Sequence, residues 1–189
     1  MSLPAKLFHL TVQEYLEFEE KSDVKHEYVA GRIFAMAGAT EGHNTIAGNL
    51  FAQLRFHLRG SGGRAYLADM KVRIEIADTF YYPDVMVTCE PFALKSVFKS
   101  NPDLIVEVLS PSTENTDRRE KLSIYRQLES LREYAIVYQD RIRVELYRKD
   151  QQNRWQLEIF EEGEAVTFHS LPSPLTLSMQ EIYEDVVFE

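Results

Sequence analysis

The chain has 189 residues, of which 44 % are apolar, enough to form the core of one domain, and we expect a single domain over residues 1–189. No stretch reaches the roughly 20 apolar residues that span a bilayer, and no charged segment followed by an apolar one opens the chain, so we expect neither a membrane segment nor a signal peptide. One cysteine, Cys89, excludes an internal disulfide and a cysteine-rich zinc cluster and favours a cytoplasmic protein, while the net charge of −9 argues against a broad basic surface for nucleic acid.

The first third of the chain predicts helices on either side of a β-hairpin. Thr11 and Glu14 have the spacing of a capping box. Ala30-Gly31 separates two short apolar runs and is typical of a hairpin turn. Leucine or isoleucine recurs every four residues from position 46 to position 58, which indicates an amphipathic helix. The elements expected here are a helix over residues 11–21, a hairpin over 28–36 and a helix over 40–58.

The rest of the chain predicts a mixed sheet with helices on its faces. We expect strands over residues 65–67, 71–76, 82–88 and 104–109, a helix over 116–131, strands over 133–138, 143–148, 155–160 and 165–168, and a terminal helix over 178–186. A strand–helix–strand unit most often makes parallel neighbours, whereas a short connection makes antiparallel ones. The fold class is therefore α/β with α+β character.

Two acids stand inside β-rich apolar runs, where carboxylates are costly unless something binds them. The polar residues 89–101 connect the two runs, and Asp84 and Glu107 are equally far from the point between Lys95 and Ser96. In a symmetric antiparallel register they would lie opposite each other, with Cβ atoms about 4.5–5.5 Å apart, whereas a slip of one residue would turn one of them away. Carboxylates that close share either a proton or a cation. The alternative is that each is a hydrogen-bonded structural group.

Lys121 falls on the apolar stripe of the helix predicted over 116–131, at a height similar to that of Glu107. It could instead extend its ammonium group to solvent from the helix edge, or pair with Asp117. Two carboxylates with water and a substrate phosphate suit Mg²⁺. Such an ion activates water against a phosphodiester, and a lysine ammonium stabilises the developing charge.

At these residues the sequence resembles the PD-(D/E)XK nuclease superfamily, and more closely a restriction-endonuclease family once classed as a domain of unknown function. The likeness covers roughly residues 10–185. The stretches that carry it are Glu27-Tyr28-Val29-Ala30-Gly31-Arg32, His43-Asn44, Pro83-Asp84, the run from Pro102 to Thr113, Asp117, Lys121, Tyr125 and Glu133-Tyr134-Ala135-Ile136-Val137.

This resemblance implies a restriction-endonuclease-like mixed β-sheet flanked by helices, with an additional C-terminal β-hairpin region. It also implies a Mg²⁺-dependent endonuclease, with Mn²⁺ as a substitute, that hydrolyses DNA phosphodiester bonds through metal-activated water. Asp84 and Glu107 would be the metal ligands. The usual lysine two residues after the second acid is replaced by Leu109, and Lys121 would take over as the catalytic cation.

Other residues of the motif have two interpretations each. Glu27 is an additional acid near the metal, or forms a surface salt bridge with Lys25 or Arg32. His43 is a proton carrier or phosphate contact, or a hydrogen-bonding group at a helix start. Tyr125 is expected in the core with its hydroxyl toward the site.

Because enzymes that cut both strands often pair two sites, we expect a homodimer. A catalytically inactive nucleic-acid- or protein-binding module on the same fold is the alternative, and a hydrolase for a smaller phosphate ester is a third reading.

Overall fold

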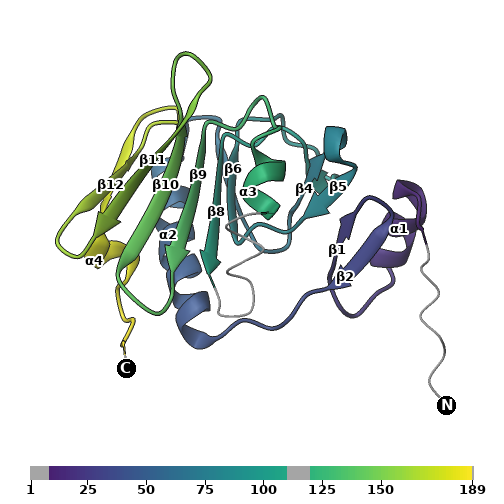
Figure 1. The fold of residues 1–189 in the computed structure, drawn as a ribbon, viewed down its shortest axis with the longest axis horizontal. Coiled ribbons are helices and arrows are strands. Elements are labelled where there is room, and N and C mark those ends of the chain that lie inside the picture. Colours follow the sequence, from purple (N-terminus) through teal and green to yellow (C-terminus); the bar gives the residue numbers. More distant parts are fainter. Residues whose placement is uncertain (1–8, 110–119, 189) are drawn as a thin grey trace.

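The computed structural model describes residues 9–109 and 120–188. Its described strands form three sheets, the largest being a mixed sheet in the order β11-β10-β9-β8-β6-β3 (Figure 1). Its strands are β3 (Arg64–Leu67), β6 (Val85–Thr88), β8 (Leu104–Leu109), β9 (Glu133–Tyr138), β10 (Arg143–Lys149) and β11 (Trp155–Glu161). β8 and β9 are parallel and the other neighbours are antiparallel, which confirms the predicted crossover.

The long helix α2 (Glu41–His57) covers one face of this sheet, as the four-residue periodicity predicts (Figure 1). Ile46, Leu50 and Leu54 are fully buried against strand residues that include Val106 and Val108. Burial of each of these large side chains contributes about 1.5–3 kcal/mol. The helix therefore holds the middle of β8 firmly from one side.

The short helix α3 (Leu122–Tyr125) lies on the opposite face of the sheet. The prediction of a helix over residues 116–131 is wrong for its C-terminal part. Residues 126–131 form turns instead, in which Leu128 N donates to Tyr125 O at 3.0 Å. Ser130 Oγ donates to Pro102 O at 2.8 Å and ties these turns to the chain before β8. Residues 116–119 lie outside the described part. Leu128 and Leu131 are nevertheless buried, so the predicted apolar stripe still faces the sheet.

A second sheet has the order β2-β1-β5-β4-β7. Its strands are β1 (His26–Val29), β2 (Arg32–Ala35), β4 (Lys71–Ile74), β5 (Thr79–Tyr81) and β7 (Phe98–Lys99). The strand predicted over 71–76 ends at Ile74, and a 3₁₀ turn over Glu75–Ala77 follows. The strand predicted over 82–88 begins only at Val85, and β5 precedes it in the other sheet, because Pro83 has no N–H for a ladder.

The N-terminal hairpin and the helix before it follow the sequence signals closely. α1 (Val12–Glu19) has the predicted capping box, in which Thr11 Oγ1 accepts from Glu14 N and the Glu14 carboxylate accepts from Thr11 N. Ala30 and Gly31 both have positive φ, 45° and 87°, as a two-residue turn between twisted strands requires. The rings of Tyr15 and Tyr28 stack at 5.0 Å between centroids and fasten α1 to β1.

The C-terminal region forms a separate hairpin of β12 (Ala165–Phe168) and β13 (Leu175–Ser178). β13 is not among the predicted strands. α4 (Met179–Ile182) is shorter than the helix predicted over 178–186 and begins with a capping box between Ser178 and Glu181. No helix in the part of the chain that the structure describes has the length and apolar character needed to cross a membrane.

The register of β6 against β8 confirms the symmetric hairpin. Val85 is paired with Val106 and Val87 with Leu104. Asp84 directly precedes β6, and the same register extended by one residue would place it opposite Glu107.

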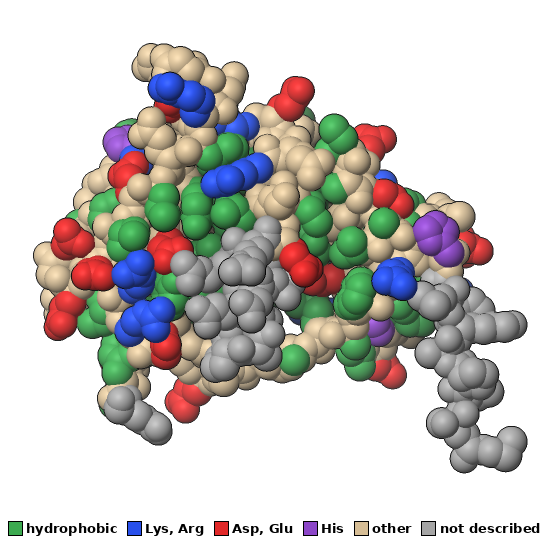
Figure 2. Space-filling model, in the orientation of Figure 1, with side chains coloured by type: hydrophobic (Ala, Val, Ile, Leu, Met, Phe, Trp, Pro, Cys, Tyr) green, Lys and Arg blue, Asp and Glu red, His purple; other side chains and the backbone are tan. Residues whose placement is uncertain are grey.

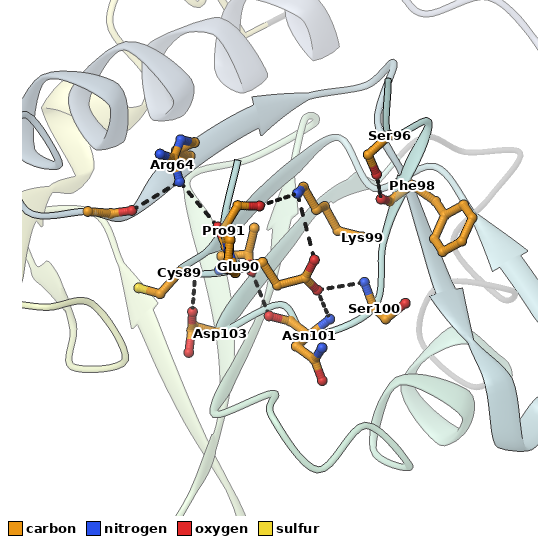
Figure 3. A network of polar contacts seen from close by, with 12 residues as sticks. Arg64, Cys89, Glu90, Pro91, Ser96, Phe98, Lys99, Ser100, Asn101 and Asp103 are labelled. Atoms are coloured by element: carbon orange, nitrogen blue, oxygen red, sulfur yellow. Dashed lines mark hydrogen bonds and ion pairs between the residues drawn. The ribbon is translucent and has the colours of Figure 1, made fainter. Parts of the chain in front are cut away.

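Polar contacts inside the connection between β6 and β8 hold the ends of this hairpin together (Figure 3). Thr88 Oγ1 donates to Asn101 O at 2.7 Å, and Cys89 N donates to Asp103 Oδ2 at 3.0 Å. Glu90 Oε1 accepts from the backbone N–H of Ser100 at 2.8 Å and from that of Asn101. Because both ends of the connection are joined, a slip in register would break several bonds at once.

We expect Glu90→Ala to lower the free energy of unfolding by about 1–3 kcal/mol, because two backbone donors lose their acceptor. Lys99, which is 3 % exposed, would also lose the carboxylate that lies 3.7 Å from its Nζ. Denaturant unfolding measures the change. Lys95→Ala, at an exposed position of the same connection, should change stability by less than about 0.5 kcal/mol. Equal stability of the two variants would show that Glu90 does not organise the connection.

Candidate active site

Glu107 is a carboxylate in the middle of the main sheet. It belongs to β8 and is only 2 % exposed. Its strand neighbours Val106 and Val108 face α2, so Glu107 projects toward the α3 side with Ile105 and Leu109. A carboxylate at that depth needs partners, and the structure supplies them from α3 and from the chain just before it.

Lys121 is the charged partner. Its Nζ lies 3.3 Å from Glu107 Oε1 and 3.0 Å from Glu27 Oε1. The ammonium group also lies over the ring of Tyr81, 5.3 Å from the centroid, at the end of β5. Lys121 is 6 % exposed and directly precedes α3, so the expected approach to Glu107 is observed and extension to solvent is not. Asp117, the other partner considered, lies outside the described residues.

Glu27 reaches the site from the N-terminal hairpin, where it stands on β1. Its contact with Lys121 means that the surface salt bridge considered for it, with Lys25 or Arg32, is not what the structure shows. Lys25 instead pairs with Asp69. Lys121 thus joins two carboxylates from different sheets, a contact that no local pattern predicts.

Tyr125 completes the surroundings of Glu107, as expected from its place on the helix. Its hydroxyl donates to Glu107 Oε1 at 2.8 Å, and the residue is fully buried. Burial, and after it the negative charge of Glu107, raises the pKa of Tyr125 well above its usual range. The hydroxyl therefore stays protonated and remains a hydrogen-bond donor that orients the carboxylate.

Asp84 also has partners, which come from β8 and from α2. Val108 N donates to Asp84 Oδ2 at 2.7 Å, and His43 Nε2 lies 3.1 Å from the same oxygen. His43 stands in the first turn of α2, where its backbone N–H donates to Thr40 Oγ1 at 3.2 Å. The backbone of His43 is therefore the predicted hydrogen-bonding group at a helix start, while its ring contacts Asp84, and its role as a proton carrier or phosphate contact stays a prediction.

One cleft of about 1390 Å³ lies between the N-terminal hairpin and the main sheet. It is lined by all five residues predicted to act in the site: Glu27, His43, Asp84, Glu107 and Lys121. Figure 2 shows acidic side chains on the face of the molecule between the main sheet and the N-terminal part. Sequence reasoning missed Tyr81 and Tyr82, which also line the cleft. Their one signal was position, since this aromatic pair directly precedes Pro83-Asp84.

The donor set suits a hard divalent cation. Two carboxylates, from Glu27 and Glu107, contact the ammonium group of Lys121, and Asp84 lines the same cleft, so a cation would offset part of the negative charge there. Mg²⁺ is commonly held by one or two carboxylates, with water and substrate phosphate supplying the rest. No cluster of three or more metal-ligating side chains occurs in residues 9–109 and 120–188. The described residues therefore form no complete metal site by themselves, and an ion held there would need water or substrate oxygens as further ligands.

The fold is shared with a solved structure whose title reads "Crystal structure of a putative nuclease belonging to DUF820 from Anabaena variabilis". That chain superposes with a TM-score of 0.77 at 21 % identity, and the likeness covers 94 % of this chain and 99 % of the other. At this identity the comparison establishes that the two chains share a fold.

Relatives at higher identity come from Synechocystis sp. "Uncharacterized protein slr1290" is 34 % identical over 180 residues, which cover 95 % of this chain and 94 % of the relative. "Uncharacterized protein sll1609" is 36 % identical over 163 residues, which cover 84 % and 92 %. Residues 12–180 also match the model of the Uma2 family. The chain therefore belongs to the family described as "Putative restriction endonuclease".

Proposed function

We propose that this nuclease-family protein is a Mg²⁺-dependent endonuclease that hydrolyses DNA phosphodiester bonds. One observation carries the proposal: Glu107 lies 3.3 Å from the buried ammonium group of Lys121, in a cleft that Asp84 also lines. Buried acids beside a buried cation at an opening suit charge stabilisation during phosphoryl chemistry. Asp84 and Glu107 would hold the ion, and Mn²⁺ would replace Mg²⁺ because it accepts the same oxygen ligands.

The residues of the chain divide the remaining work. When bound, the metal supplies an activated water and stabilises the leaving oxygen. Lys121 Nζ faces the attacked phosphate and stabilises the charge that develops on it. Tyr125 and Glu27 are positioning residues, because the first orients Glu107 and the second orients Lys121. His43 positions Asp84, and its imidazole lines the cleft, where it would serve proton transfer.

Leu109 matters for the alternative function. It occupies the position of the usual superfamily lysine and is 4 % exposed within the core cluster of α3. A chain without that lysine could be a non-catalytic binding module on the same fold. Lys121 favours the enzyme instead, because an ammonium group stands beside Glu107 although it comes from another element.

We expect Asp84→Asn to abolish Mg²⁺ binding at millimolar concentration and to lower Mg²⁺-supported cleavage at least about a hundredfold, because one of two charged ligands is lost. Calorimetry measures binding, and closed circular DNA, both duplex and single-stranded, reports endonuclease cleavage. Asp140→Asn, a change at an exposed turn carboxylate paired with Arg141, should match the unaltered protein.

Two outcomes contradict the proposal. Cleavage that survives in purified Asp84→Asn protein would point to a contaminating nuclease. DNA binding without any Mg²⁺ or Mn²⁺ binding and without cleavage would establish the non-catalytic module.

A further inference from the structure

The N-terminal hairpin has two faces with different surroundings. Tyr28 and Ile33 face α1 and join the aromatic cluster of Tyr15 and Phe80. Strand alternation sends Glu27 and Phe34 to the opposite face, and both line the cleft. This second face is therefore a wall of the candidate active site and not part of the N-terminal core.

Phe34 is a large aromatic side chain beside the charged centre. It is directly opposite Glu27 in the register of β1 and β2, so their Cβ atoms are about 4.5–5.5 Å apart. Phe34 is 50 % exposed. Its partner Glu27 contacts Lys121, so only one residue separates Phe34 from the ammonium group. A half-exposed aromatic ring is common on a surface. On the wall of a cleft, next to the proposed reacting groups, it offers a flat apolar surface to a ligand.

The charged groups themselves are recessed. The side chains of Glu107 and Lys121 are 3 % and 8 % exposed, and those of Glu27 and Asp84 are 16 % and 15 % exposed. Residues 36–40, which connect β2 to α2, line the cleft on the side of Phe34 (Figure 1). A phosphate that approaches Glu107 and Lys121 must therefore enter a recessed site. The phosphates of a duplex are accompanied by a second strand, which an extended single strand does not carry.

The net charge of the chain also favours a single-stranded substrate over a duplex. Duplex affinity rests on many phosphate contacts from lysine and arginine, and this chain has a net charge of −9. Single-stranded nucleic acid is held by base stacking on aromatic rings together with a few basic groups. Arg32 is exposed two residues before Phe34 on the same strand, and so on the same face, which places one such group beside the ring.

We propose that the substrate is single-stranded DNA, or a strand separated from its partner, and that Phe34 stacks on a base next to the phosphate that faces Lys121. The cleft volume of about 1390 Å³ exceeds the roughly 300–1,000 Å³ of a site for one drug-sized ligand. It therefore accommodates a short run of nucleotides. This inference rests on the proposed nuclease function for the meaning of the bound phosphate.

The test uses fluorescence anisotropy of a labelled oligonucleotide, either single or annealed to its complement, with the full chain in EDTA. We expect the single strand to bind at least about tenfold more tightly than the duplex. Phe34→Ala should weaken single-strand binding about tenfold, and Phe34→Tyr should retain it, because either aromatic ring stacks on a base. Phe56→Ala is the matched control, since Phe56 is 66 % exposed and lies outside the cleft.

Equal affinity for the two DNA forms, or equal effects of Phe34→Ala and Phe56→Ala, would overturn the inference. Because no metal is present, this result is independent of whether the protein cleaves. A separate cleavage assay with Mg²⁺ then decides the nuclease function, and preferential cutting of circular single-stranded over circular duplex DNA supports both.

Discussion

Replacing Glu107 by glutamine should lower Mg²⁺-supported DNA cleavage by about 10²- to 10³-fold or more, the loss typical when one charge-stabilising group is removed from an active site. Glutamine has nearly the same shape, and its carbonyl oxygen still accepts from Tyr125, which donates to Glu107 Oε1 at 2.8 Å. What disappears is the negative charge that would hold the metal. Initial cleavage rates and Mg²⁺ titration by calorimetry measure the two effects.

The matched control is Glu133→Gln. Glu133 is another buried glutamate, 1 % exposed, on the neighbouring strand β9, where Arg148 Nε donates to it at 2.7 Å. It also accepts from the backbone of His169 and Ser170, away from the cleft. We expect this change to lower the free energy of unfolding by about 1–3 kcal/mol while cleavage below the melting temperature continues. If Glu107→Gln cleaves as fast as Glu133→Gln, Glu107 does not hold the metal.

Replacing Lys121 by methionine should reduce the cleavage rate at least about a hundredfold without weakening Mg²⁺ binding. Methionine retains the apolar stem but removes the ammonium group that contacts Glu27 and Glu107. The two carboxylates then lose their shared cation, which should cost about 3–5 kcal/mol of folding stability. Added Mg²⁺ should restore part of it, because a ligand that binds only the folded state stabilises that state.

Lys149→Met provides the comparison, since Lys149 Nζ donates to the carbonyls of Leu128 and Glu129 outside the cleft. Thermal melts with and without Mg²⁺, together with cleavage rates, separate the two variants. An unchanged rate for Lys121→Met at a temperature where it is folded would limit Lys121 to a structural bridge. A Lys121→Met protein that Mg²⁺ does not stabilise would argue against a metal at the paired acids.

Local patterns alone determine a large part of this molecule. The capping box at Thr11 and the four-residue repeat from Ile46 to Leu58 specify α1 and α2, because helix contacts connect residues only three or four positions apart. The opposition of Asp84 and Glu107 is nearly as local. It follows from two apolar strands joined by one connection, because Asp84 and Glu107 are equally far from the midpoint of that hairpin. The polar contacts of Glu90 join the two ends of the connection.

The tertiary structure decides which distant groups join that pair. Glu27 stands on β1, which pairs with β5 in the second sheet, whereas Glu107 stands in the main sheet. The chain passes from β5 in one sheet to β6 in the other at Pro83, and the packing of the two sheets brings Glu27 to Lys121. His43 reaches Asp84 only because α2 packs across the main sheet. Such contacts depend on how sheets and helices pack over long sequence separations, where spacing carries no information. The sequence by itself thus specifies the two acids and the register of their hairpin. Tertiary packing alone brings Glu27 to Lys121, places Phe34 on the wall of the cleft and gives the cleft its shape.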